Sequence, residues 1–168
     1  MKKILVDALI FSLLFGGFIT LIQLINPRLE LHNYPPSIKN KVEKKSPQEI
    51  KLFKKLAIPM VLILFLFLNG TILYSYWNFE VSFIKIFFHY FFILFFFSIF
   101  DLFILDWLIF CTITPEYLII PGTDKNSGYK NYTYHINGSL GKGLIILSIA
   151  SLIFSITMYL FLKFFIWN

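Results

Sequence analysis

The chain has 168 residues, of which 58% are hydrophobic, and its mean hydropathy is +0.75. A soluble domain is about 45–50% apolar, so this excess argues against a soluble globular protein and indicates one that is dissolved in a membrane. The formal net charge is +6, and the lone Cys111 allows no disulfide within the chain.

Residues 4–25 form the first apolar run. Lys2 and Lys3 resemble the start of a signal peptide, but no A-x-A-like cleavage site follows and Asp7 interrupts the run, which predicts a retained transmembrane helix. Small residues recur every four positions along one face of this helix, and such a face lets another helix come close. We expect it to pack on a neighbouring helix, a protein partner or a second copy of the chain. The face consists of Ala8, Ser12, Gly16 and Thr20.

The segment 26–55 is strongly basic and holds more than half of the fifteen Lys and Arg residues. Asn26-Pro27 ends the first helix, because proline cannot continue the hydrogen-bond ladder. Basic residues beside a bilayer indicate attraction to anionic lipid headgroups rather than nucleic-acid binding, and a solvated cytoplasmic loop is the simpler interpretation.

A helix start is expected at Ser46-Pro47-Gln48-Glu49, where serine can cap, proline suits the first turn and glutamate completes a capping box. We predict a short amphipathic helix in the headgroup layer, which bends near Pro59 into a second span over about 56–77. The residues expected to contact lipid headgroups are Lys51, Lys54 and Lys55.

The third span is predicted over 83–111, a phenylalanine-rich run that contains Asp101 and Asp106. A polar segment with many turn signals follows over 112–143, and the fourth span is predicted over 144–166. Within the polar segment, 116–120 and 129–136 have strand-like composition and predict a small hairpin. The expected fold class is an all-α integral membrane protein with four transmembrane helices, a basic amphipathic interfacial helix and one structured cytoplasmic loop.

The distribution of Lys and Arg predicts the orientation. Placing segments 26–55 and 112–143 on the same side collects most of the basic residues there, so both are predicted to be cytoplasmic and both termini outside. We expect a multi-pass protein of the bacterial cytoplasmic membrane, built as a single membrane domain over residues 1–168.

The two aspartates of the third span are the main candidates for chemistry, because a carboxylate inside an apolar run costs about 2.5–3.5 kcal/mol and needs a partner or a wet cavity. At about 100° per residue, Ser98 lies about 60° and Asp106 about 140° from Asp101, whereas His89 lies about 240° away. The sequence therefore predicts one polar arc on this helix, with His89 outside it.

Three interpretations of the aspartates stay open. They can bond donors on neighbouring helices and specify packing, or Asp101 can join Asn69 in a proton or cation path. They can also line a cytoplasm-facing pocket that holds a metal or performs acid–base chemistry on a lipid headgroup. The candidate catalytic residues are Asp101, Asp106, Glu116 and His135, with Asp124 nearby in the loop; the candidate metal ligands are Asp101, Asp106 and His135.

The runs FDLFILDWLIFCTITPEYLIIPGTD (100–124) and INPRLELHNYPPSIKNKV (25–42) resemble a family of uncharacterised small bacterial membrane proteins with several spans. The resemblance covers about a third of the chain and implies no activity. It suggests that the Asp101/Asp106 run and Pro121-Gly122-Thr123 form one functional unit.

No metalloprotease, prenyl-transfer or phosphate-loop motif occurs in the sequence. The predicted function is a structural or interaction protein, for example an immunity-type protein that blocks a toxin in the membrane. The alternative is a membrane-embedded enzyme or an ion- or proton-coupled transporter with a polar pocket around Asp101 and Asp106.

Overall fold

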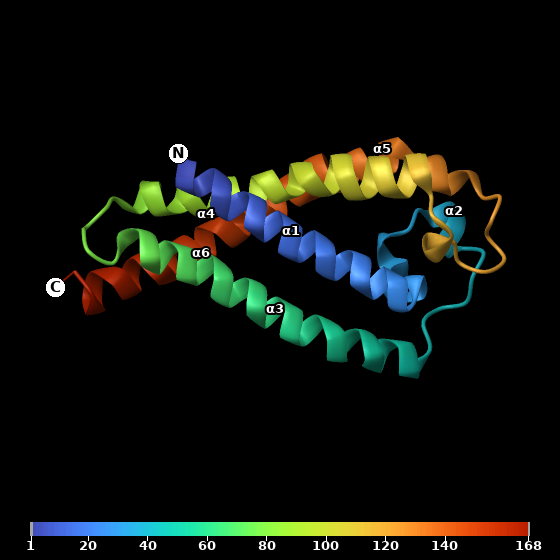
Figure 1. Cartoon of the computed structure of the whole chain (residues 1–168), viewed down its shortest axis with the longest axis horizontal. Helices are drawn as coiled ribbons and strands as arrows, with labels where there is room; N and C mark the ends of the chain where they lie inside the picture. Colours follow the sequence, from blue (N-terminus) through green and yellow to red (C-terminus); the bar gives the residue numbers. More distant parts are fainter. Residues whose placement is uncertain (1, 168) are drawn as a thin grey trace.

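The computed structural model describes residues 2–167, and no strand occurs among them. Four long helical rods run side by side (Figure 1). The rods are formed by α1 (Lys2–Ile25), α3 (Pro47–Tyr76), α4 (Phe83–Phe100) continued by η2 (Asp101–Ile113), and α5 (Tyr132–Ile136) continued by η5 (Asn137–Gly143) and α6 (Leu144–Phe165).

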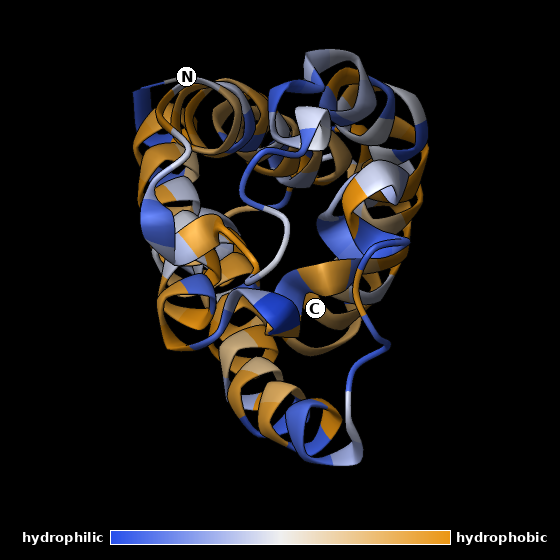
Figure 2. Ribbon diagram, turned by 90° about the vertical axis from the view of Figure 1, so that its right-hand side faces the viewer, coloured by the Kyte–Doolittle hydropathy of each residue, from blue (hydrophilic) through white to orange (hydrophobic). Residues whose placement is uncertain are grey.

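All four rods are long and apolar enough to cross a membrane, and many large apolar side chains point outward from them. Leu66 is 64% exposed and Ile146 is 67% exposed, and apolar residues cover most of each helix (Figure 2). Such a surface is unfavourable in water and suits hydrocarbon, so the four-helix architecture expected from the sequence is compatible with a multi-pass membrane protein.

The small-residue face of α1 packs inside the chain against α4 and η2. Ala8, Ser12 and Gly16 are buried, and a Cβ atom on Gly16 would lie 2.8 Å from Cε1 of Phe100. The expected close approach of a neighbouring helix is therefore satisfied within the monomer. A contact with a protein partner or second copy through the Ala8/Ser12/Gly16/Thr20 face stays a prediction, and it would have to compete with this packing.

Both chain ends lie near one end of the bundle, and the two long connections lie together at the other end (Figure 1). The first connection contains η1 (Pro27–Asn33) and α2 (Pro36–Lys39), and the second contains η3 (Glu116–Leu118) and η4 (Ser127–Lys130). The hairpin predicted over 116–120 and 129–136 is wrong: both ranges contain short helical turns, and they meet through side chains, with the Tyr129 hydroxyl accepting from the Ile120 amide at 2.9 Å, rather than through paired strands.

The two connections share a small apolar core, which we call the cap. Its buried residues are Leu31, Tyr34, Ile38, Phe110, Cys111, Leu118, Ile120 and Tyr129. Tyr34 donates a hydrogen bond to the carbonyl of Leu118 at 2.8 Å, and the Asn126 amide donates to the carbonyl of Ser37 at 2.8 Å. The interpretation of 26–55 as a merely solvated loop is therefore too simple, because these hydrogen bonds and this core fold much of it against 112–131.

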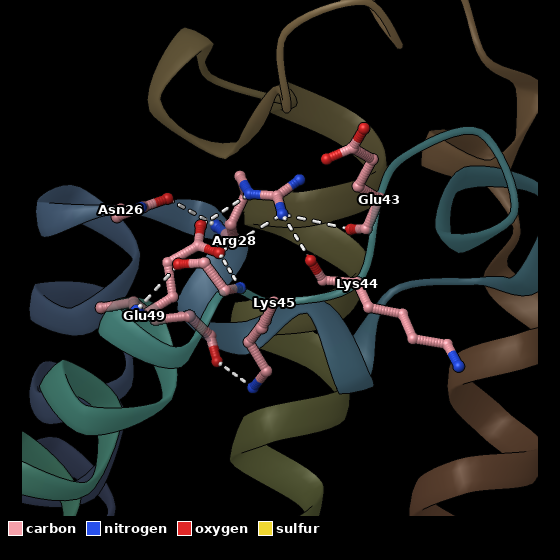
Figure 3. Close-up of polar contacts among 8 residues, drawn as sticks. Asn26, Arg28, Glu43, Lys44, Lys45 and Glu49 are labelled. Carbon is pink, nitrogen blue, oxygen red and sulfur yellow. Dashed lines mark hydrogen bonds and ion pairs between the residues drawn. The ribbon is translucent and has the colours of Figure 1, made fainter.

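Helix α3 begins as predicted, at a capping box. The Ser46 hydroxyl accepts from the Glu49 amide at 3.2 Å, and the Glu49 carboxylate accepts from the Ser46 amide at 2.7 Å. The same carboxylate binds Arg28 at 2.6 Å, and Arg28 also donates to the carbonyls of Glu43 and Lys44 (Figure 3). This clasp holds the start of α3 against η1.

Helix α3 continues without interruption through Pro59, so the short interfacial helix predicted before that residue is the first part of one long helix. Lys51, Lys54 and Lys55 are exposed on it. Their contact with lipid headgroups stays a prediction.

Candidate functional site

A cavity of about 680 Å³ lies at the cap end of the bundle, between α1, α4 and the rod that contains α5, η5 and α6. This volume is within the range of about 300–1,000 Å³ that is usual for small-molecule sites. Its polar lining residues are Gln23, Asn33, Tyr34, Ser98, Asp101, Asp106, Tyr134, His135, Asn137, Ser139 and Lys142.

Asp106 and His135 pair in this cavity, with the Asp106 Oδ1 atom 2.9 Å from Nδ1 of His135, which is within hydrogen-bond distance. The imidazole is buried and its position is fixed by the rings of Phe110 and Tyr134, whose centroids lie 5.0 and 5.3 Å away. The other ring nitrogen, Nε2, is buried without a hydrogen-bond partner among the described residues. A histidine held at one nitrogen by a carboxylate and free at the other can accept or give a proton.

Asp101 lines the same cavity from the first turn of η2. Its carboxylate makes no hydrogen bond or ion pair with any side chain in residues 2–167, in contrast to Asp106. The hydroxyl of Ser98, one turn earlier, donates a hydrogen bond to the carbonyl of Ser139 at 3.4 Å. A carboxylate in an apolar helix requires a partner or water, so Asp101 is available to a ligand of the cavity.

The geometry of η2 explains why both aspartates face this cavity. The segment is π-helical, with backbone hydrogen bonds that span five residues, and at its end the Thr114 amide donates to the Ile109 carbonyl at 2.8 Å. Residues five apart then lie nearly above one another, so Asp101 and Asp106 share a face. The separation of about 140° expected for an α-helix is therefore wrong here. π-Helical turns are frequent at functional sites.

The other candidates from the sequence lie elsewhere. Glu116 and Asp124 are exposed in the second connection and do not line the cavity. Thr123 is buried in the cap, where its hydroxyl lies 2.7 Å from that of Tyr129, so the Pro121-Gly122-Thr123 turn supports the cap rather than the cavity. Cys111 is buried in the cap core.

The predicted metal ligands do not form a complete site by themselves. Within the described part of the chain, no group of three or more His, Cys, Asp or Glu residues is placed to hold a metal ion. Asp106 and His135 are paired with each other, and Asp101 lies one wide turn away on η2. The donor set suits a hydrogen-bonded organic cation better than a divalent metal, which prefers several oxygen or nitrogen ligands together.

A second buried polar cluster lies near the end of the bundle where the termini are, and the sequence analysis missed it. His89 Nε2 is 3.5 Å from Oδ2 of Asp7, and His89 Nδ1 is 3.0 Å from the hydroxyl of Tyr76. The available signal was that Asp7 and His89 each interrupt an apolar run. A helix-by-helix analysis could not place them opposite one another.

Phe11 and Phe15 on α1 and Phe97 on α4 come, along each helix, after the residues of the Asp7–His89 cluster and before the polar end of the cavity. Phe15 and Phe97 stack with centroids 4.4 Å apart, and the Phe11–Phe97 centroids are 5.8 Å apart. Asn69, the second residue of the predicted ion path, accepts a hydrogen bond from the Tyr90 hydroxyl at 2.9 Å, and the path stays a prediction.

The fold and site define an all-helical protein with four helices that could span a membrane and an acidic cavity at one end of them. No family model, curated protein or solved structure matches the chain.

Proposed function

We propose that this chain is a multi-pass membrane protein that binds a polar, amine-bearing molecule in the cavity beside Asp101 and exchanges a proton with it through His135. The observation that supports the proposal most is the convergence of an unpartnered carboxylate with an Asp106–His135 pair in one cavity of about 680 Å³. This is the pocket interpretation of the two aspartates.

The chemistry follows from the donors and acceptors. An ammonium group offers hydrogen bonds and positive charge, which an isolated carboxylate in a low-dielectric site binds strongly. The Asp106 carboxylate orients the imidazole through Nδ1, and Nε2, which has no hydrogen-bond partner among the described residues, is the nitrogen left to accept a proton from a bound amine. Such an arrangement serves binding, and it also provides the acid–base couple that an enzyme acting on the amine would need.

The experiment is a thermal unfolding series on the purified full chain in detergent. Ethanolamine should raise Tm in a concentration-dependent way, since a ligand that binds only the folded state stabilises it. Sodium chloride at equal ionic strength should not. Asp101→Asn should fold and lose the shift, whereas Asp124→Asn, at an exposed aspartate outside the cavity, should keep it. An equal shift with sodium chloride, or a full shift in Asp101→Asn, would overturn the proposal.

We further propose that the chain lies in the bacterial cytoplasmic membrane with the cap, and hence the mouth of the cavity, on the cytoplasmic side. The excess of Lys and Arg in the two long connections supports this orientation. A structural or interaction role, including the immunity type, stays a prediction from the sequence.

A further inference from the structure

We propose that the natural occupant of the cavity is a phospholipid whose zwitterionic headgroup carries a primary amine, such as phosphatidylethanolamine. The inference rests on the proposed function and names the ligand class for the same site. It is carried by the distribution of polarity and of charge along the cavity walls.

The cavity is polar at the cap end and apolar toward the middle of the bundle. Along α1 its lining changes from Gln23 to Ile19 and Phe15, and along the third rod it changes from Asp106 and Asp101 to Phe97 and Leu94. The fourth rod repeats this order. Its lining runs from Asn137 and Lys142 through Leu147 to Ala150. A cavity with one polar and one apolar end is complementary to an amphiphile.

Two opposite charges in this lining have no ion-pair partner within residues 2–167. Asp101 makes no ion pair, and the Lys142 ammonium makes none with any carboxylate in residues 2–167. A zwitterionic headgroup supplies the missing partner for each: its ammonium for Asp101 and its phosphate for Lys142. Quaternary ammonium headgroups lack the N–H donors that a carboxylate binds, and headgroups without an amine lack the positive charge.

The cavity also has an edge that faces outward. Ile146 lines it and is 67% exposed on the surface that we assign to hydrocarbon. Acyl chains can therefore leave the cavity at this edge and remain in the bilayer while the headgroup is held inside. Gly138 lines the polar end, and a Cβ atom there would meet no atom within 4 Å, so the wall leaves space for a headgroup.

The test is native mass spectrometry of the full chain with an equimolar mixture of phosphatidylethanolamine, phosphatidylcholine and phosphatidylglycerol of matched acyl chains. We expect retention of phosphatidylethanolamine at about tenfold or more over the other two, the size expected from one charge-assisted hydrogen-bonding group. Equal retention of the three lipids would overturn the inference.

Two variants test the binding of the acyl chains and of the phosphate separately. Ala150→Phe fills the apolar end and should reduce lipid retention several-fold without changing stabilisation by ethanolamine. Ile149→Phe, at a neighbouring exposed position outside the cavity, is its control. Lys142→Gln, at an exposed site that should tolerate substitution, should weaken binding of phosphatidylethanolamine and leave ethanolamine unaffected.

These measurements also distinguish the lipid inference from the proposed amine-binding function. If ethanolamine stabilises the protein through Asp101 but Ala150→Phe and Lys142→Gln change nothing, the lipid inference fails and the amine site stands. If phosphoethanolamine, which lacks acyl chains, binds as tightly as the lipid, the ligand is a soluble zwitterion and the inference also fails. If no amine stabilises the wild-type chain, the proposed function fails.

Discussion

The Nδ1 atom of His135 lies 2.9 Å from the Asp106 carboxylate, although the two residues belong to separate helical rods. The pair joins η2 to α5 and fixes one wall of the cavity. Because His135 is buried, the interaction is protected from the solvent screening that weakens surface pairs.

We expect Asp106→Asn and His135→Gln to destabilise the protein less than additively, with a coupling free energy of about 0.5–3 kcal/mol, because each single variant already removes the carboxylate–imidazole contact. The measurement is a double-mutant cycle from unfolding in detergent. Asp124→Asn combined with His135→Gln is the matched control, since the exposed Asp124 lies outside the cavity, and it should show additive effects. A coupling near zero for Asp106 and His135 would show that the pair contributes nothing to stability.

Adjacent glycines on α1 give a second prediction. Gly16→Ala should destabilise the bundle by about 1–3 kcal/mol, because its Cβ would lie 2.8 Å from a ring atom of Phe100. Gly17→Ala should be neutral or stabilising by up to about 1 kcal/mol, since nothing lies within 4 Å and alanine favours helix. Thermal unfolding of both variants checks this, and equal effects at the two sites would contradict the α1–α4 packing.

The capping box at the start of α3 is also open to test. Ser46→Ala should cost about 0.5–2 kcal/mol, because the Glu49 amide loses its acceptor. Ser127→Ala, at an exposed serine, should change stability little. Hydrogen exchange of the first turn of α3 should rise only in the Ser46 variant, and unchanged protection there would contradict the predicted role of the cap.

The cap should lose stability as the pH rises above the usual range of a carboxyl group. Burial raises the pKa of Glu30, against the opposing effects of Lys45 and of the hydrogen bond from Asn33. The folded state therefore binds this proton more tightly, so the contribution is present at low pH and is lost as the pH rises through the raised pKa.

Glu30→Gln should reduce this fall in the free energy of unfolding with pH, because the glutamine amide is neutral and its oxygen can still accept from Asn33. His32, whose pKa is lowered mainly by burial, gives the opposite slope at higher pH, so the difference between wild type and Glu30→Gln is the quantity to measure. Unfolding between pH 4 and 8, the range that spans ordinary carboxyl and imidazole values, provides it. A difference that does not vary with pH would contradict the raised pKa.

Topology is tested by single cysteines at Asn40 and Ser127 in a Cys111→Ser background. Both positions are exposed in the connections, and we expect both to resist a membrane-impermeant thiol reagent in intact cells and to react after permeabilisation. A cysteine at Glu80, between α3 and α4 at the opposite end, is the control that should react in intact cells. Labelling of Asn40 and Ser127 from outside would reverse the proposed orientation.

The sequence by itself determined the four apolar helices, the capping box at Ser46 and the polar character of Asp101, Asp106 and His135, because length, periodicity and local hydrogen-bonding signals are properties of neighbouring residues. Only the tertiary structure decided how these parts meet. The π-helical turns of η2 put Asp101 and Asp106 on one face, and the cap brought His135 to Asp106 and excluded the expected hairpin. Asp7 and His89 likewise meet only when α1 packs on α4, since long-range packing selects partners that no local pattern records.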